Sequence, residues 1–515
     1  MTPAQTPILA ETPFPEWAHD IERARIANGI AGMSVAVVHK DKIIFAQGFG
    51  RRNENNDPFT AETVAPIASQ TKAFTTAAIG ELVAEGKMDW TKTPVNAYLP
   101  EFQLKDPLLT SQLNLTDILS HRSGIQDLDL SWYNAKESRR NLIKKMRHVE
   151  AQYPLRAEWH YNNICYAVAG EAAANVAGVE YEDLVRDKVI RPVGLTNTGF
   201  SQTEMSKRPN YAMPYSARTM EEAQSGKYEQ GELDRNYMTD APAGDMYSSV
   251  LDLAVWARTM MGTGALDGIQ ILNKESIKYI QTGHSVMTGT RRGPEFGAVE
   301  AYGLAWIIDT YKGQLVYRHS GSVSGYRSNS AHFPNAELAV MVLTNMDHAQ
   351  LPIFLPYYIA DSLLNLPKTK DWLMDVAVAD TQDIYRESEK IAKGDHLPPQ
   401  IKNTALSRDL KDYVGEYEHP YFQSVFVRLE SSMVDKDGYA EHGDIEQGSK
   451  SRLHFQYSTM VAQLEHYHYE SFRAQLVDFS LEAALLPTFT TGDDGQVNGV
   501  TCDFLGEQVQ WTKKN

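Results

Sequence analysis

The sequence predicts an α+β fold, with one antiparallel sheet flanked by helices and a helical domain, followed by a small C-terminal β-barrel. Three observations predict it. β-rich runs stand at both ends of residues 1–366, a long helical block separates them, and short strand-like runs follow beyond about residue 406. Strands at the two ends of such a segment can assemble into one sheet with the helices packed beside it.

The first strands are predicted to form a hairpin. Residues Ser34–Val38 and Ile43–Gly48 are β-rich runs joined by a short charged turn. The segment SQTKAFTTAAIGELVAEG follows, with apolar residues at helical spacing and Gly86 as a stop signal. Ser69 is therefore expected at the start of a helix, with Lys72 one turn further on.

Helices alternate with loops through the central block. The segments LTDILSHRSGI, CYAVAGEAAANVAG and SSVLDLAVWARTMMGTG each predict a helix, the last with a serine start and a glycine stop. Strands return in YGLAWIIDT, GQLVYRHSG and ELAVMVLTN, and a helix is expected in IFLPYYIADSLLNL.

The chain changes character after Pro367. A charged linker helix ending in Pro-Pro comes first, and then the runs YVGEYEH, SVFVRLE, RLHFQY, FRAQLVDF and VNGVTCDF at the spacing of a small β-barrel or sandwich. The predicted domains are residues 1–366, a linker helix in 367–405 and a barrel domain in 406–515.

Composition limits the classes of function. A chain of 515 residues is too long for one core, and 42% hydrophobic with 22% charged residues is typical of a globular protein. A net charge of -17 without a lysine or arginine cluster disfavours nucleic acid and anionic membranes as partners. We expect a small-molecule or peptide substrate, and the sequence leaves homo-oligomerisation open.

Neither the N-terminus nor the cysteines indicate export. The segment MTPAQTPILAETPFPEW has no basic stretch followed by an apolar one, and no apolar run is long enough to cross a bilayer. Cys165 and Cys502 fit no metal or redox spacing. The expected location is cytoplasmic.

Ser69 and Lys72 admit two interpretations. Serine is among the best helix N-caps, so Ser69 could be a cap only. Alternatively, residues three apart on a helix face each other, so the Lys72 amine could take the proton of a nucleophilic Ser69 hydroxyl.

Two further motifs carry the same ambiguity. Tyr161 and Asn163 in HYNNICY are either a loop tyrosine and a capping asparagine, or a base beside Lys72 and a donor to a substrate carbonyl. His319 and Gly321 in RHSGSVSGY are either an ordinary strand turn or a substrate-binding edge. In the second case the Ser322 amide would complete an oxyanion hole with the amide of Ser69.

Taken together, these motifs resemble those of a serine hydrolase superfamily. It comprises class C β-lactamases, penicillin-binding carboxypeptidases, D-aminopeptidases and related esterases, and it carries Ser-x-x-Lys, Tyr-x-Asn and Lys/His-x-Gly in this order. The segments AGMSVAVVHKDKIIFAQGFG, LTDILSHRSGI and IRPVGLTNTGF are similar too, and the resemblance covers residues 26–366. The C-terminal segment resembles the lipocalin-like domain appended to some peptidases of this family.

The resemblance implies roles for these residues. Ser69 would be the acylated nucleophile, Lys72 and Tyr161 would share proton transfer, Asn163 would position the substrate, and His319 with Gly321 would flank the leaving side. No metal or cofactor is implied.

This sequence departs from the family pattern in two places. His319 stands where β-lactamases carry a lysine, which favours peptidase or esterase activity, and Arg318 should point to the opposite face of the strand. YPLRAEWHYNN lacks the Pro-Gly often found before Tyr-x-Asn.

The favoured hypothesis is a metal-independent serine hydrolase of esters or amides, such as small peptides or D-amino-acid derivatives. An acyltransferase with the same acyl-enzyme and a non-catalytic ligand-binding protein are the alternatives. His466 and His468 alternate on a strand, but no third metal ligand accompanies them. The barrel is expected either to hold an apolar ligand or, with more support, to narrow the active-site entrance or mediate oligomer contacts.

Overall fold

The computed structural model of the protein contains two compact units. One comprises residues 1–127 and 138–384, and the other residues 128–137 and 385–515. The predicted domains were residues 1–366, 367–405 and 406–515. They included residues 128–137 in the first domain, whereas the structure groups this segment with the second unit. The structure describes residues 14–126, 128–132, 135, 137–233, 238–287, 293–429, 452–479, 481–504 and 506–514.

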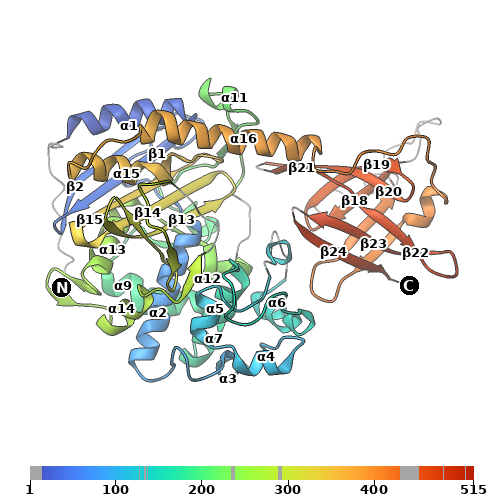
Figure 1. Ribbon diagram of the computed structural model, residues 1–515, viewed down its shortest axis with the longest axis horizontal. Coiled ribbons are helices and arrows are strands. Elements are labelled where there is room, and N and C mark those ends of the chain that lie inside the picture. The colour runs from blue at the N-terminus through green and yellow to red at the C-terminus, as the bar shows by residue number, and fades with distance from the viewer. Residues whose placement is uncertain are drawn as a thin grey trace. The chain divides into compact units, whose positions relative to one another are not determined.

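An antiparallel sheet forms the centre of the first unit (Figure 1). Its strand order is β10-β11-β12-β13-β14-β15-β1-β2, so the N-terminal hairpin pairs with the last strand of the unit, as predicted. The predicted strand at 302–310 is divided between β11 and β12, and β14 was not predicted. The strands are β1 (Gly32–His39), β2 (Lys42–Gly50), β10 (Ser285–Met287), β11 (Glu300–Tyr302), β12 (Ile307–Tyr311), β13 (Gln314–Val323), β14 (Tyr326–Phe333) and β15 (Leu338–Thr344).

Helices cover both faces of this sheet, which explains why every residue of β15 and nearly every residue of β1 is buried. In Figure 1, α1 and α15 lie on one side of the strands, and α13 and α2 lie on the other. The longer helices of the unit are α1 (Pro15–Ala27), α2 (Thr71–Ala84), α7 (Asn163–Ala177), α13 (Val250–Met261) and α15 (Leu351–Leu363).

Short helices fill the block between the hairpin and the later strands. They are α3 (Val95–Tyr98), α4 (Pro107–Gln112), α5 (Leu115–Leu119), α6 (Arg139–Lys145), α8 (Tyr181–Val185), α9 (Arg191–Val193), α10 (Gln202–Met205), α11 (Met220–Gln224), α12 (Ala241–Gly244) and α14 (Lys274–Ile280). A small separate sheet has the order β3 (Ala65–Pro66), β7 (Met246–Ser248) and β4 (Gly199–Phe200). The helix α16 (Ala377–Lys393) follows the unit's last elements in the predicted linker.

The second unit contains the predicted barrel. Strand order β19-β18-β17-β16-β24-β23-β22-β20 is closed by pairing of β19 with β20, and β21 adds to β20. The strands are β16 (Gly415–Glu418), β17 (Val425–Leu429), β18 (Leu453–Tyr457), β19 (Met460–His468), β20 (Ser471–Asp478), β21 (Leu481–Leu485), β22 (Thr488–Thr491), β23 (Val497–Phe504) and β24 (Glu507–Lys513). The lipocalin-like label itself stays a prediction.

Aromatic rings pack against one another inside the barrel. Tyr413, Phe472 and Phe489 form one cluster of ring contacts, and Tyr457, Phe504 and Trp511 form another. All six side chains are buried. The barrel core is therefore built from its own side chains, as we expect for short strands.

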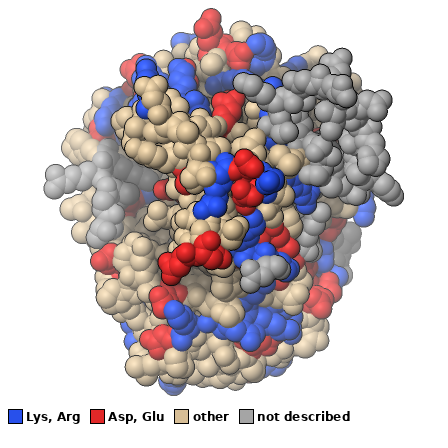
Figure 2. Space-filling model, turned by 90° about the vertical axis from the view of Figure 1, so that its right-hand side faces the viewer, with Lys and Arg blue, Asp and Glu red and all other residues tan. Residues whose placement is uncertain are grey.

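In the described part of the chain, no helix combines the length and the apolarity that crossing a membrane requires. The N-terminal segment tested for a leader falls largely in residues 1–13, outside the described residues. On the face shown in Figure 2, basic and acidic side chains are interspersed, and neither sign covers the surface.

Candidate active site

Ser69 lies in a 3-10 turn, Ala68–Gln70, that leads directly into α2. Its side chain is partly exposed, whereas Ala68 and Gln70 are buried. Gln70 occupies the N-cap position of α2 and makes no side-chain cap hydrogen bond, so the interpretation of Ser69 as a simple cap is wrong. Ala68 has a φ of 49°, in the left-handed region that is uncommon for residues other than glycine.

Lys72 is fully buried one turn along from Ser69. Its Nζ lies 3.1 Å from Ser69 Oγ, 2.6 Å from Asn163 Oδ1 and 3.0 Å from the backbone carbonyl of Ala243. The predicted helical spacing thus places the amine beside the hydroxyl, and two elements distant in sequence add acceptors around it.

Tyr161 completes a triangle with Ser69 and Lys72. Its hydroxyl donates a hydrogen bond to Ser69 Oγ at 2.9 Å, and Lys72 Nζ lies 4.8 Å from the centre of its ring. In the alternative interpretation, this hydroxyl was expected to form a hydrogen bond with the backbone, and Asn163 was expected to cap a helix. Asn162 is the N-cap of α7 instead, since its side chain accepts a hydrogen bond from the Cys165 amide, and Asn163 is the first residue of the helix.

Gly321 on β13 allows the strand to approach the segment that precedes Ser69. A Cβ at Gly321 would lie 2.1 Å from the Ile67 carbonyl oxygen. Ser328, which pairs with Gly321 across β14, donates to that same oxygen at 2.8 Å. The close approach predicted for this glycine is thus an approach to the protein's own backbone.

Ser322 has an exposed side chain, and the register of β13 with β14 turns its backbone N–H away from β14. Val323 pairs with Tyr326 across a two-residue turn, so Ser322 and Arg327 form the next, non-hydrogen-bonded pair. The neighbouring strand β12 pairs with β13 only from Gln314 to Arg318. The amide of Ser322 is therefore not used by either ladder of the sheet.

His319 is a neutral hydrogen-bonding group. Its Nδ1 donates to the Ser320 carbonyl at 2.7 Å, so its Nε2 accepts from the Tyr302 hydroxyl at 2.9 Å. Burial lowers the pKa of His319 to about 3. Arg318 points to the other face of the strand, as predicted, and pairs there with Glu300.

A shell of uncharged aromatic side chains surrounds these groups. The ring of His121 lies 4.4 Å from that of Tyr161, and its Nδ1 accepts a hydrogen bond from the Asn162 amide at 3.1 Å. Burial lowers the pKa of His121 well below its usual value. Burial likewise raises the pKa of Tyr166 and of Tyr302 well above the usual value.

Sequence reasoning missed most of this shell. His121 lies in the segment LTDILSHRSGI, which predicted only a helix. Its backbone has a left-handed φ of 59°, which no residue pattern indicates. Tyr302 and Ala243 lie in unrelated segments, and the carbonyl of Ala243 acts through the backbone, which no residue pattern can reveal.

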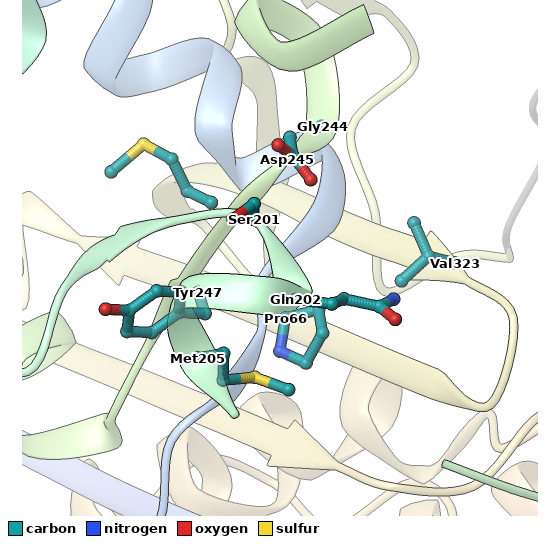
Figure 3. A pocket seen from close by; sticks show the side chains of 9 residues that line it. Pro66, Ser201, Gln202, Met205, Gly244, Asp245, Tyr247 and Val323 are labelled. Carbon is teal, nitrogen blue, oxygen red and sulfur yellow. The ribbon is translucent and has the colours of Figure 1, made fainter. Parts of the chain in front are cut away.

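A small cavity lies beside Gly244, the residue after Ala243 (Figure 3). Gly244, Asp245, Gln202, Tyr247 and Val323 are among the residues that line it. Within the described part of the chain, Oδ2 of the buried Asp245 has no hydrogen-bond partner. Burial, followed by the repulsion of Glu182, raises the pKa of Asp245 to about 8, so this carboxyl is protonated at neutral pH.

The two histidines on β19 are bound to the backbone separately. His466 Nε2 lies 3.0 Å from the Tyr469 carbonyl, and His468 Nδ1 accepts from the Ile401 amide at 3.4 Å. Across the described ranges, no group of three or more candidate metal ligands is found. Cys165 and Cys502 are both buried, and neither forms a disulfide bond.

Two family models match the chain. The one described as Beta-lactamase matches residues 18–364, and the one described as Domain of unknown function (DUF3471) matches residues 399–514.

Individual relatives are similar at low identity. The chain is 26% identical over 506 residues to the unguisins hydrolase ungD' of Aspergillus campestris, covering 94% of this chain and 89% of the relative. The octameric penicillin-binding protein homologue from Pyrococcus abyssi superposes with a TM-score of 0.59 at 22% identity, over 97% of this chain and all of that one (100%). D-amino acid amidase from Ochrobactrum anthropi superposes with a TM-score of 0.52 at 19% identity, over 73% and 99% of the two chains.

Proposed function

We propose, given that the chain belongs to the beta-lactamase family, that it is a serine hydrolase that cleaves an ester or amide bond through an acyl-enzyme on Ser69. The observation that supports this most directly is the triangle of Ser69, Lys72 and Tyr161, with contacts of 3.1 Å and 2.9 Å to the serine oxygen. The proposed chemistry needs no metal or cofactor.

The surroundings of Lys72 suit a base. An uncharged lysine amine has two N–H groups and one lone pair. The oxygens of Asn163 and Ala243 can only accept, so they match the two N–H groups. The hydroxyl of Ser69 can donate, so it matches the lone pair. Complete burial of this side chain also disfavours a charged ammonium ion.

In the acylation step, Ser69 Oγ forms a bond to the substrate carbonyl carbon while its proton passes to the Lys72 amine. The amides of Ser69 and Ser322 are the proposed donors to the oxyanion, a type of stabilisation worth about 3–4 kcal/mol per donor. The bond to the leaving group then breaks as the Tyr161 hydroxyl protonates that group. Tyr161 then takes up the proton that Lys72 received from Ser69, so both groups end the step in the protonation state in which they began it.

Deacylation reverses the roles of the same groups. A water molecule attacks the ester carbonyl, and Tyr161 with Lys72 accepts its proton. The carboxylic acid is released when that proton returns to Ser69 Oγ. An acceptor alcohol or amine in place of water would make the enzyme an acyltransferase, which remains the alternative chemistry.

Substrates without a strongly anionic group next to the scissile bond suit the site best. His319 is neutral, Arg318 faces away, and the other aromatic groups around Lys72 are uncharged at neutral pH. Asn163 and the edge of β13 at Gly321 are the proposed contacts to the substrate amide. The names of the relatives, a hydrolase of unguisins and a D-amino acid amidase, favour amides with D-residues or small peptides for the first screen.

Intact-mass spectrometry tests the proposal. The protein is incubated with a p-nitrophenyl ester and, separately, with a fluorophosphonate probe, and the adduct is mapped by peptide analysis. We expect one adduct on Ser69 that is absent from Ser69→Ala. Ser322→Ala is the matched control and should still be labelled, because the proposal uses only its backbone amide. No adduct on the unaltered protein would favour a non-catalytic binding protein.

A further inference from the structure

Two buried polar side chains lie on the wall of the cavity beside Gly244 (Figure 3). Within the part of the chain that the structure describes, neither Oδ2 of Asp245 nor Oε1 of Gln202 has a hydrogen-bond partner. Each of these residues is only 6% exposed. Because an unsatisfied buried polar atom is costly, two of them on one cavity indicate a site that a polar group of a ligand can occupy.

The small sheet of β3, β7 and β4 brings these two side chains together. Phe200 of β4 pairs with Met246 of β7, and the Ser201 amide donates to the Asp245 carbonyl at 2.9 Å. Gln202 follows Ser201 and is the first residue of α10. The pairing of the two strands therefore holds Asp245 and Gln202 at the same cavity.

The rest of the wall is mostly apolar or already hydrogen-bonded. Its apolar side chains are Pro66, Met205, Met246 and Val323. The Tyr247 hydroxyl donates to a Glu204 carboxylate oxygen at 2.9 Å, and Ser201 Oγ accepts from the Glu204 amide at 3.1 Å. A small group in this cavity would thus meet two polar partners in apolar surroundings.

The two polar partners differ in what they can do. Burial raises the pKa of Asp245 to about 8, so at neutral pH its carboxyl carries a proton and can donate a hydrogen bond. The side-chain oxygen of Gln202 can only accept one. A carboxylate cannot donate to Gln202, and an ammonium group cannot accept from Asp245. An uncharged hydroxyl or primary carboxamide group can do both.

The wall of the cavity is bonded to the segment that carries Ser69. The Ile67 amide donates to the Met246 carbonyl at 2.9 Å. A Cβ at Gly244 would lie 4.0 Å from the carbonyl carbon of Ala68, the atom to which the Ser69 nitrogen is attached. The cavity therefore borders the peptide unit that contains the first proposed oxyanion donor.

The position of the cavity indicates which part of a substrate can enter it. Val323 follows Ser322, whose amide is the second proposed oxyanion donor. Tyr161, the proposed proton donor to the leaving group, packs instead near His121 and His319, with ring centres 4.4 Å and 6.4 Å away. The lining of the cavity, taken over the described residues, includes none of these three. The cavity thus lies on the acyl side of a carbonyl held by the two amides.

We propose that this cavity is a subsite for the acyl part of the substrate, where a hydroxyl or primary carboxamide group binds between Asp245 and Gln202. Asp245 donates to the oxygen of that group, and Gln202 Oε1 accepts from its O–H or N–H. Both residues determine specificity and contribute no reacting atom. The subsite rests on the proposed function, because the acyl part is defined by its transfer to Ser69.

The test compares two esters that differ in one group. In p-nitrophenyl 3-hydroxypropanoate, a hydroxyl replaces the terminal methyl of p-nitrophenyl butanoate. The ratio of their kcat/KM values is corrected for their hydroxide-catalysed rates and measured for each variant. We expect the unaltered protein to prefer the hydroxy ester. We expect the ratio to fall about five-fold in Asp245→Leu and in Gln202→Met, the effect of one neutral hydrogen bond each.

Two further variants separate hydrogen bonding from the shape of the cavity. Asp245→Asn keeps an uncharged donor and should retain the preference for the hydroxy ester. Met205→Leu changes an apolar side chain of the same wall and should leave the ratio unchanged. Circular dichroism verifies the fold of each variant. The same ratio in Asp245→Leu, Gln202→Met and the unaltered protein would overturn the proposed subsite, and so would an equal fall in Met205→Leu.

Hydrolysis of neither ester by the unaltered protein would contradict the proposed function, and binding then tests the subsite by itself. Ligand-observed NMR compares 3-hydroxypropanamide with butanamide. We expect the hydroxyamide to bind more tightly to the unaltered protein, and Asp245→Leu to remove the difference. Equal binding of the two amides to the unaltered protein would overturn the subsite.

Discussion

The Lys72 amine and the Ala243 carbonyl form a hydrogen bond of 3.0 Å across 171 positions of the chain. The carbonyl oxygen can only accept a hydrogen bond, so this contact orients one N–H bond of Lys72 toward Ala243. Asn163 Oδ1 is a second such acceptor at 2.6 Å, and Ser69 Oγ lies 3.1 Å from the same nitrogen. In the proposed mechanism, backbone and amide oxygens thus orient the amine toward the serine hydroxyl.

Replacing Lys72 with methionine keeps the length of the side chain and removes the base. We expect the acylation rate to fall by about 10²–10⁴-fold, the usual contribution of a positioned general base. The measurement is burst kinetics with a p-nitrophenyl ester, with circular dichroism to verify the fold. Lys188→Met, at a lysine that pairs with Glu85, is the control and should retain the rate. A Lys72→Met rate within ten-fold of the control would contradict the proposed role.

Gly321→Ala tests the close approach of β13 to the nucleophile segment. The new Cβ would lie 2.1 Å from the Ile67 carbonyl oxygen, so the strand or the Ser69 turn must move. We expect a loss of about 1–3 kcal/mol in the free energy of unfolding, typical of overpacking, together with slower acylation. Urea denaturation and burst kinetics check the two effects.

Gly244→Ala is the matched control for stability, since its nearest neighbour would lie 3.9 Å from the new Cβ. An equal loss of stability in the two variants would mean that the contact with Ile67 is not the cause.

Asp245→Asn should stabilise the protein increasingly as pH rises. The folded-state pKa of Asp245 is raised to about 8 by burial, whereas the unfolded chain ionises near pH 4. Between these values the folded state holds a proton that the unfolded state has lost, so stability falls with pH by up to about 1.4 kcal/mol per unit. The asparagine variant lacks this loss.

Urea denaturation of both proteins at pH 5 and pH 8 measures the difference. The exposed Asp375 provides a control in Asp375→Asn, which should follow the unaltered protein at both values. A gap between Asp245→Asn and the unaltered protein that does not widen with pH would contradict the prediction.

His332→Leu should have the opposite pH dependence. Burial lowers the folded-state pKa of His332 to about 3, and neither ring nitrogen has a hydrogen-bond partner in the described part of the chain. Between about pH 3 and 6.5 the unfolded state binds a proton that the folded state excludes, so stability is lost as pH falls through this window. Leucine has no titratable group. We therefore expect the free energy of unfolding of the variant, relative to the unaltered protein, to rise by up to about 1.4 kcal/mol for each pH unit of acidification.

Chemical denaturation at pH 4.5 and pH 7.5 checks this expectation. His148→Leu, at an exposed position, is the control and should show no such gain. A constant difference between His332→Leu and the unaltered protein would show that the imidazole is already protonated in the folded state.

The strands show which elements a sequence pattern can predict. β1 and β2 both contain β-branched residues, and a short charged turn joins them. This pattern predicted a hairpin, and the antiparallel pairing of the two strands confirms it. β14 has the sequence YRSNSAHF and was missed, because four of its buried residues, Ser328, Asn329, Ser330 and His332, are polar. Ser328 and Ser330 can be buried there because their hydroxyls donate hydrogen bonds. The acceptors are the Ile67 carbonyl oxygen at 2.8 Å and Gln70 Oε1 at 2.5 Å. The predicted strand at 302–310 is interrupted at Ala305, whose φ is 74°.

By itself, the sequence determined the relations that span one turn of a helix or one pair of strands. The distance from Ser69 to Lys72 is of this kind, because helical periodicity alone brings residues three apart together. The antiparallel sheet and the C-terminal barrel also followed from local alternation and turn spacing.

Only the tertiary structure decided which distant groups meet and which of them carry charge. Tyr161 reaches Ser69 across 92 positions, and Leu128–Ser131 joins a barrel that begins far downstream. His319 is neutral because desolvation by the surrounding packing outweighs its intrinsic basicity. Desolvation and long-range contact depend on the whole packed chain, so no local pattern of residues contains them.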